Sequence, residues 1–467
     1  MTTFYQSQLA ILVSTCAIFV LLQRYLLRKA PQHGSRAENT AGSVAATKLT
    51  RQYLWVYGLT MGADWLQGPY IYSIYREQYG LSERMVALLF VLGFLTAGIS
   101  APAVGVWADQ YGRKRMCMIF CVTYSCACAI IQVPSLPVLF VGRLLGGFST
   151  AILFSCFESW LVSSANSLSL SSRDLSTILG HASFVNSIAA TVAGVFSNKL
   201  VEYSSSFSSP FLASGALLLL NLVVIWASWT ENYGGPSASV QELFNVRRLS
   251  EAWSVVCSGN FDRRLFVLGL AQTCFEGSMY IFVFLWVPFL QEAAQPDQSL
   301  PLGYIFSCFM LSMTLGALLY NFIISLSQPT SPTDASTHDH TVTLHAKFSS
   351  AVCTASALAF VLSISTESER KRFWSFCAFE ACVGMYYPVQ GMLRGKLVPD
   401  EHRATLSSLF RVPLNVFVVV SLMTGVASAR HFVLSACAVL LFLTALVTAA
   451  SFLGRARTPP LASLRAQ

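Results

Sequence analysis

The sequence predicts an all-α polytopic membrane protein, and three observations carry this prediction. Of the 467 residues, 54% are hydrophobic and 11% are charged, whereas an average soluble domain has about 25% charged residues. The apolar residues gather in runs close to the roughly 20 residues that a helix needs to cross the hydrocarbon core of a membrane. These runs are continuous, unlike the alternating segments of about ten residues that form transmembrane strands.

Thirteen such runs follow one another along the chain. They lie at residues 7–27, 52–75, 84–108, 116–133, 138–162, 174–200, 210–229, 264–290, 302–326, 346–365, 373–396, 404–428 and 432–453. Basic residues follow the first run and none precedes it, which is typical of an uncleaved anchor rather than a secretory signal. Without that anchor twelve spans remain, and the longest internal hydrophilic segment, Thr230–Asp262, separates the first six from the last six. We therefore expect two six-helix halves plus one extra N-terminal helix.

This plan divides the chain into five parts. They are an N-terminal anchor and cytoplasmic linker (1–49), an N-terminal half (50–229), a central cytoplasmic linker (230–262), a C-terminal half (263–454) and a cytoplasmic tail (455–467). Lys and Arg gather in the linkers, in the tail and at two further cytoplasmic ends, Arg113–Arg115 and Arg394–Arg403. The positive-inside rule therefore predicts an extracytoplasmic N-terminus and a cytoplasmic C-terminus. The exception is Arg370–Arg372, which falls on the opposite side beside Glu367 and Glu369.

Several charged side chains fall inside the predicted spans, and five of them are the most informative. They are Arg143, Glu158, Glu276, Glu380 and Arg411. An ionisable group near the centre of the bilayer costs a few kcal/mol, so it persists mainly where it faces a protein interior or an aqueous cavity. The five charges predict a pathway for a polar solute.

One motif is highly specific. The stretch from Gly105 to Arg115 reads GVWADQYGRKR and matches the G-x-x-x-D-x-x-G-R-[RK]-[RK] signature between the second and third core helices of the major facilitator superfamily. Gly105 allows helices to approach closely, Gly112 permits a tight turn, and Asp109 can pair with basic groups in one conformation only. An ordinary basic loop explains Arg113–Arg115 but neither the glycines nor Asp109. We therefore predict a cytoplasmic gate at Gly105, Asp109, Gly112 and Arg113, with Glu158 as a structural partner.

Several further segments resemble the molybdate-anion transporter family of that superfamily. They are Asp64–Tyr75, Gly142–Gly147, Phe157–Leu161, Phe379–Glu380 and Arg411–Asn415. The resemblance covers about residues 50–450 and implies a transporter that imports molybdate across the cell membrane and has no cofactor. The identity of the anion comes from this resemblance alone, because composition and spacing do not show it.

The buried charges suit such a substrate. Molybdate is a tetrahedral dianion, and the planar guanidinium of Arg matches paired oxygens better than Lys does. We predict that Arg143 and Arg411, one in each half, hold the anion. The further predicted donors are His181, Asn186, Asn415, Tyr70 and Tyr72. The alternative for Arg143 is a residue near a helix end that extends to the membrane surface.

Three carboxylates have two possible roles. Glu276, Glu380 and Asp64 either neutralise the arginines when the site is empty or take up a coupled proton. Coupling matters because a dianion that enters a negative interior works against about 2.3 kcal/mol per charge per 100 mV.

Other functions stay open at this point. The chain could carry a sugar, an organic anion or another inorganic anion, or it could be a membrane sensor that transports nothing. An enzyme is not expected, because no catalytic motif is present. The net charge of +8 reflects the loops rather than a nucleic-acid site, so the expected surroundings are the lipid bilayer. The segment from Gln328 to His345 is expected to be a polar loop rather than a metal site.

Overall fold

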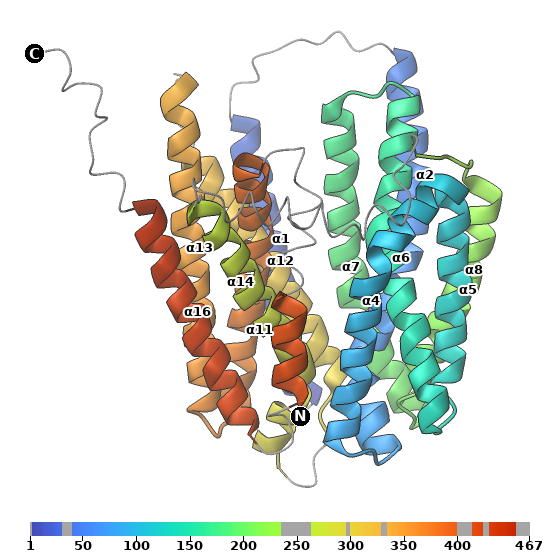
Figure 1. Cartoon of the computed structure of the whole chain (residues 1–467), viewed down its shortest axis with the longest axis vertical. Helices are drawn as coiled ribbons and strands as arrows, with labels where there is room; N and C mark the ends of the chain where they lie inside the picture. Colours follow the sequence, from blue (N-terminus) through green and yellow to red (C-terminus); the bar gives the residue numbers. More distant parts are fainter. Residues whose placement is uncertain are drawn as a thin grey trace, which may run out of the picture. The chain divides into compact units, whose positions relative to one another are not determined.

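The computed structural model describes residues 2–29, 40–234, 263–295, 299–327, 334–398, 413–423 and 429–453. These residues form helices and no strand, which confirms the predicted all-α class (Figure 1). The long helices are α1 (Thr2–Lys29), α2 (Thr40–Gln67), α4 (Glu83–Tyr111), α5 (Arg113–Ile130), α6 (Leu136–Ser167), α7 (Ser172–Ser204), α8 (Ser209–Ser228), α11 (Arg263–Ala293), α12 (Leu302–Ser327), α13 (Asp334–Ile364), α14 (Glu369–Leu397) and α16 (Arg430–Leu453). The described part of the predicted span 404–428 holds a shorter helix, Pro413–Met423.

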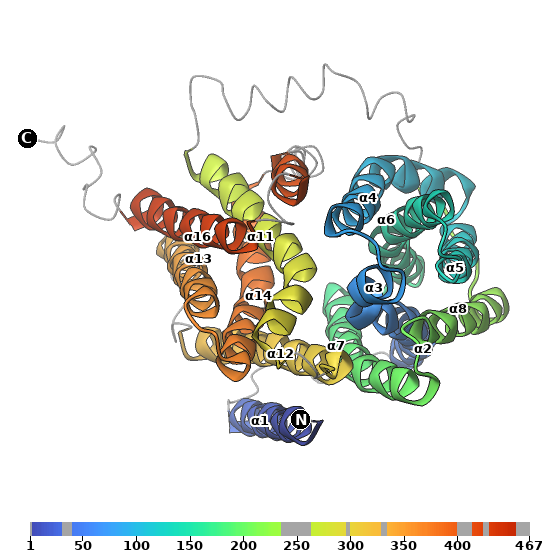
Figure 2. The ribbon, with the colours of Figure 1, turned by 90° about the horizontal axis from the view of Figure 1, so that it is seen from below.

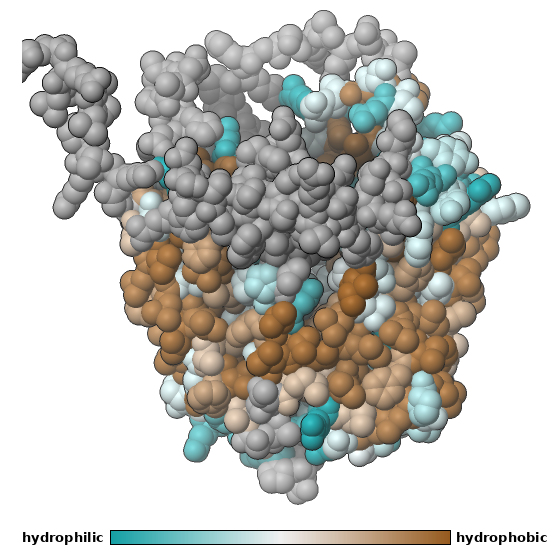
Figure 3. Space-filling view, viewed as in Figure 1, coloured by the Kyte–Doolittle hydropathy of each residue, from teal (hydrophilic) through white to brown (hydrophobic). Residues whose placement is uncertain are grey.

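Nine of the described helices are long and apolar enough to cross a membrane. Helices α2, α5 and α14 are not among them, although each coincides with a predicted span. α14 contains Arg370, Lys371 and Arg372 in its first turns and Glu380 in its middle, and such charges lower the mean hydropathy of a helix. On the face in Figure 3, hydrophobic residues cover the middle of the described helices.

The expectation of a polar loop at residues 328–345 is wrong from residue 334 onward. Helix α13 begins at Asp334, and Pro329 and Pro332 both precede it, so neither interrupts its hydrogen bonds. His345 is buried on this helix. Its Nε2 lies 2.9 Å from the Tyr320 hydroxyl and its Nδ1 lies 2.8 Å from the Thr341 carbonyl, so the imidazole is satisfied within the protein.

The chain folds as two compact units. Unit 1 comprises residues 1–14, 21–245 and 299–311, and unit 2 comprises residues 15–20, 246–298 and 312–467. The first part of α12 therefore packs with unit 1, although it was assigned to the C-terminal half in the sequence-based plan. The boundaries of the two predicted halves stay a prediction.

In unit 1, α4 packs on α6, α6 on α5, and α2 on α7 and α8 (Figure 2). α4 and α6 approach closely because Gly147 faces Gly93. A Cβ at residue 147 would lie 2.5 Å from the Gly93 carbonyl oxygen. Small residues permit such contacts between membrane helices.

Helix α2 ends at Gln67 because Gly68 and Pro69 follow it. Proline supplies no N–H and breaks the hydrogen-bond ladder. The chain continues as a 3₁₀ turn (Gly68–Tyr70), the short helix α3 (Ile71–Ser73) and a π-helical turn (Ile74–Gln78). Turns of π-helix are frequent at functional sites.

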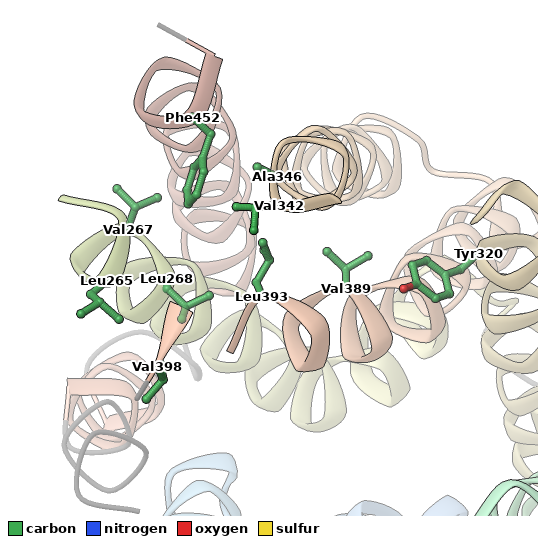
Figure 4. Close-up of a cluster of buried hydrophobic side chains, with 10 residues drawn as sticks. All are labelled: Leu265, Val267, Leu268, Tyr320, Val342, Ala346, Val389, Leu393, Val398 and Phe452. Carbon is green, nitrogen blue, oxygen red and sulfur yellow. The ribbon is translucent and has the colours of Figure 1, made fainter. Parts of the chain in front are cut away.

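In unit 2, α13 packs on α14 and α16, and α11 packs on the same two helices. A cluster of buried side chains joins them (Figure 4). Its members are Leu265, Val267, Leu268, Tyr320, Val342, Ala346, Val389, Leu393, Val398 and Phe452. The cluster lies next to Arg394, which follows Leu393 on α14.

Candidate functional site

Arg143 lies inside the helix bundle of unit 1. Its Nε donates a hydrogen bond to the Leu89 carbonyl on α4 at 3.0 Å, and its guanidinium carbon lies 5.5 Å from the centre of the Phe90 ring. The side chain crosses α4 at Gly93, where a Cβ would collide with the guanidinium. Arg143 therefore points toward α4 within the bundle, and the alternative of a side chain that extends to the membrane surface does not describe this conformation.

Tyr75 is the aromatic residue beside Arg143. It belongs to the π-helical turn after α3, is 1% exposed, and its hydroxyl interacts with the guanidinium. Both residues line a cavity of about 20 Å³ together with Gln67 and Tyr124. A cavity of this size holds about one water molecule, so the site must widen before it admits a tetrahedral oxyanion.

A predicted carboxylate lies near the same cavity. Asp64 on α2 accepts a hydrogen bond of 2.7 Å from the Tyr124 hydroxyl. Within the described residues, no ion pair joins Asp64 to Arg143. The Tyr124 hydroxyl therefore holds the Asp64 carboxylate.

The other predicted donors of unit 1 have separate surroundings. Asn186 accepts a hydrogen bond of 2.7 Å from the Trp65 indole N–H, and His181 is exposed on α7. The hydroxyl of buried Tyr70 donates to Asn198 at 3.1 Å, and that of buried Tyr72 donates to Glu83 at 3.2 Å. These contacts place neither tyrosine hydroxyl on Arg143, and the binding roles of all four residues stay predictions.

The predicted residues of unit 2 are only partly described. Arg411 lies outside the described residues. Asn415 is half-buried on the helix Pro413–Met423. Glu380 is 6% exposed on α14, and no hydrogen bond or ion pair to its carboxylate occurs among the described residues.

Glu276 forms an ion pair with Arg394 that the sequence did not predict. Its Oε1 lies 3.3 Å from the Arg394 guanidinium and accepts a hydrogen bond of 3.3 Å from the Tyr386 hydroxyl. The Tyr386 ring stacks on Phe275 with 3.9 Å between ring centres. The pair joins α11 to α14 and is mostly shielded, since 13% of the Glu276 side chain and 28% of the Arg394 side chain are exposed.

The predicted gate loop connects α4 to α5. Asp109 pairs with Arg113 at 2.7 Å, one helical turn further on. Gly112 has a φ of +106°, a backbone conformation that favours glycine. At Gly105, a Cβ would meet no atom within 4 Å among the described residues. In this conformation, therefore, no described helix approaches Gly105 as closely as the sequence predicts.

A segment after α8, which we call the clamp (residues 229–234), holds this loop. Glu231 accepts hydrogen bonds from the backbone N–H groups of Lys114 at 2.8 Å and Arg115 at 3.2 Å. It thereby caps α5, where a negative charge favours the helix dipole. The clamp is anchored on α6, because Trp229 stacks on Trp160 with 3.7 Å between ring centres.

The clamp also meets the gate loop through its backbone. The Arg113 N–H donates to the Asn232 carbonyl at 3.0 Å, and the Gly234 N–H donates to the Asp109 carbonyl at 3.1 Å. Glu158 is exposed and lines a cavity of about 620 Å³ together with Arg113 and Tyr233. The structure thus brings Asp109, Gly112, Arg113 and Glu158 to one end of unit 1.

Sequence reasoning missed three residues of these arrangements. Tyr75 is part of a quoted segment, but nothing in the sequence shows that the turn after Pro69 directs it toward Arg143. Arg394 lies at the end of a predicted span, where the sequence predicts only a basic residue beside the cytoplasm, and Glu231 lies at the start of the predicted central linker. The polar sequence Thr230-Glu231-Asn232 directly follows a predicted span, and it is the signal that could have indicated a cap on a neighbouring helix.

Comparisons with known proteins identify the relatives of this chain. A family model described as "Sugar-transporters, 12 TM" matches residues 24–333. The chain is 31% identical over 432 residues to the molybdate-anion transporter of Takifugu rubripes, and the alignment covers 88% of this chain and 85% of that protein. It is 31% identical over 436 residues to the molybdate-anion transporter of Xenopus laevis, and that alignment covers 90% of this chain and 89% of the relative.

A solved structure shows a similar fold. The nucleoside transporter NupG superimposes with a TM-score of 0.66 over 86% of this chain and 100% of its own, at 13% sequence identity. At that identity the likeness concerns the fold alone, which is that of a multi-pass membrane transporter.

Proposed function

Because the chain belongs to the molybdate-anion transporter family of the major facilitator superfamily, we propose that it imports molybdate by alternating access. The relationship to molybdate-anion transporters over most of both chains carries this proposal. The proposed setting is the cell membrane, with the N-terminus outside and the C-terminus in the cytoplasm. The chain then acts as a transporter and not as an enzyme.

The surroundings of Arg143 support an oxyanion as the substrate. A guanidinium carries five N–H donors, and the hydrogen bond to Leu89 occupies the one on Nε. Among the described residues no carboxylate forms an ion pair with it. A tetrahedral anion that enters the widened cavity would find a cation and the Tyr75 hydroxyl side by side. Arg411 is the proposed second cation.

Proton coupling is the proposed use of the buried carboxylates. Glu380 suits this role better than Glu276, because Glu276 is paired with Arg394 whereas Glu380 has no charged partner among the described residues. A proton that binds Glu380 during import would offset part of the electrical cost of a dianion. Asp64, held by Tyr124, is the corresponding group of unit 1.

The test is uptake of labelled molybdate in cells that are depleted of it. We expect tungstate to compete strongly and collapse of the proton gradient to reduce accumulation, with sulfate as the competitor that defines selectivity. Arg143→Gln should abolish uptake at normal surface expression. Arg84→Gln is the matched control, since Arg84 is exposed near the start of α4 and makes no ion pair in the described part of the chain. Uptake by Arg143→Gln at the level of the control would contradict the proposal.

A second candidate is an acidic sugar or another organic anion. The description of the matching family model as sugar transporters favours it. The same cells distinguish the two, because a sugar-acid carrier would not accumulate labelled molybdate, and a sugar acid in excess would not reduce molybdate uptake by a molybdate carrier.

A further inference from the structure

The basic run Arg370–Arg372 has no part in the proposed transport mechanism. Arg372 is 3% exposed. It donates hydrogen bonds to the carbonyls of Phe289 and Thr366 and lies 3.6 Å from the Glu292 carboxylate. Arg372 therefore ties the start of α14 to the end of α11. The two residues before it, Arg370 and Lys371, are exposed instead.

Arg370 and Lys371 are exposed and line a groove of about 750 Å³ between α13 and α14. Lys371, Trp374 and Ala378 follow one another along a single face of α14, as their spacing of three and four residues requires. Leu358 and Leu362 form the opposite wall on α13 and are 57% and 50% exposed. The groove is apolar along its length and basic at the end where α13 turns into α14.

We propose that this groove binds one anionic phospholipid. The phosphate would lie at Arg370 and Lys371, and an acyl chain would lie against Leu358 and Leu362. From Lys371 to Ala378 the helix rises about 10 Å, which gives the chain an apolar wall directly below the charges. Trp374 lies between the charged and the apolar part, the position that tryptophan favours at a membrane interface.

The local charges fit this ligand. Ser365 and Thr366 also line the groove and add hydroxyl groups at its basic end. Glu367 is exposed on the same turn but does not line the groove, and Glu369 is buried. Positive charge directly beside exposed hydrocarbon is the combination that fits the phosphate and the acyl chain of one anionic lipid. The proposal concerns unit 2 alone and does not rest on the transported substrate.

Trp374 provides the measurement. The purified full-length chain is placed in phosphatidylcholine vesicles that contain phosphatidylglycerol, and either lipid carries bromine on its acyl chains. Brominated phosphatidylglycerol should quench the fluorescence component that is lost in Trp374→Phe, and brominated phosphatidylcholine should quench it weakly. Since each cation near a membrane surface contributes about fivefold to the binding of anionic lipid, Lys371→Gln should lower the preference about fivefold and the double variant with Arg370→Gln about 25-fold.

Two control variants distinguish lipid binding in this groove from general electrostatic attraction between the protein and anionic lipid, and a competition distinguishes it from binding of a soluble anion. Arg84→Gln also removes one exposed cation at the start of a helix and should leave the preference unchanged. Ala378→Phe keeps all charges but fills the groove at an exposed position, and it should abolish the quenching. Equal quenching by both lipids, an equal effect of Arg84→Gln, or displacement of the lipid by inorganic phosphate or molybdate would each overturn the proposal.

Discussion

Two half-buried arginines, Arg143 in unit 1 and Arg394 in unit 2, show how the same charge can be held in two ways. Arg394 of unit 2 pairs with Glu276 at 3.3 Å. Arg143 of unit 1 is held by the Leu89 carbonyl, the Phe90 ring and Tyr75, and none of these neighbours carries a full negative charge. A carboxylate neutralises the charge of a shielded guanidinium and offsets part of its desolvation cost, whereas neutral partners leave its charge for a ligand. We therefore propose a structural role for Arg394 and anion binding for Arg143.

The largest expected effect comes from removing the charge of Arg143. Arg143→Gln should weaken molybdate binding by about 100-fold or more, because each charge-assisted hydrogen bond contributes roughly 1.5–3 kcal/mol. Calorimetric titration of the purified protein measures it. Arg143→Lys keeps the charge but not the planar fork, so its loss should be smaller. If Arg394→Gln weakens binding as much as Arg143→Gln does, the two arginines share one role and the comparison fails.

The pair in unit 2 should affect stability instead. Arg394→Gln removes a cation from the mostly shielded Glu276 carboxylate, and we expect a loss of about 2 kcal/mol in the free energy of unfolding, less than for a fully buried pair because both side chains keep some exposure. Glu276→Gln should cost a similar amount. In a double-mutant cycle the combined variant should lose less than the sum of the two. Additive losses would show that the contact at 3.3 Å contributes nothing.

Two glycines lie where α4 contacts α6, and their substitution tests two different effects. Gly147 tests the packing of the helices, and Gly93 tests the placement of the Arg143 guanidinium. Gly147→Ala brings a methyl group against the backbone of Gly93, which cannot move without separating the helices, so unfolding should become easier by roughly 1–3 kcal/mol. Gly93→Ala meets the end of the flexible Arg143 side chain, so it should displace the guanidinium, weaken molybdate binding and leave thermal stability nearly unchanged. Thermal melts and titrations of both variants test this contrast. Equal melting temperatures for the two variants would contradict it.

The sequence predicted the helices of both units well and their polar contacts poorly. Continuous apolar runs fixed where α4, α6 and α16 lie, since length and hydropathy are local properties of the chain. Arg394 appeared to be a cytoplasmic end residue because only the packing of α14 on α11 brings it to Glu276. Arg143 could be predicted because a charged residue inside an apolar run is recognisable in the sequence even when its contacts are unknown.

The same limit explains Glu231 and the start of α13. Glu231 caps a helix that begins 118 positions earlier, at Arg113, and no local pattern connects the two. The polar residues after Pro332 resemble a loop in composition, yet they begin a helix that contains buried residues further along, such as Val352 and Phe360. Tertiary packing overrides local composition in both cases, and the site residues depend on such contacts more than the spans do.

The smallest expected effect tests whether Tyr75 belongs to the anion site at all. Tyr75→Phe removes one hydroxyl from a ring that is 1% exposed and keeps its packing. A neutral hydrogen bond contributes about 0.5–1.5 kcal/mol, so molybdate binding should weaken by roughly twofold to tenfold. Tyr72→Phe is the matched control, because Tyr72 lies one turn earlier and its hydroxyl donates to Glu83. A larger loss of binding in Tyr72→Phe than in Tyr75→Phe would move the anion site away from the π-helical turn and toward the residues predicted from sequence alone.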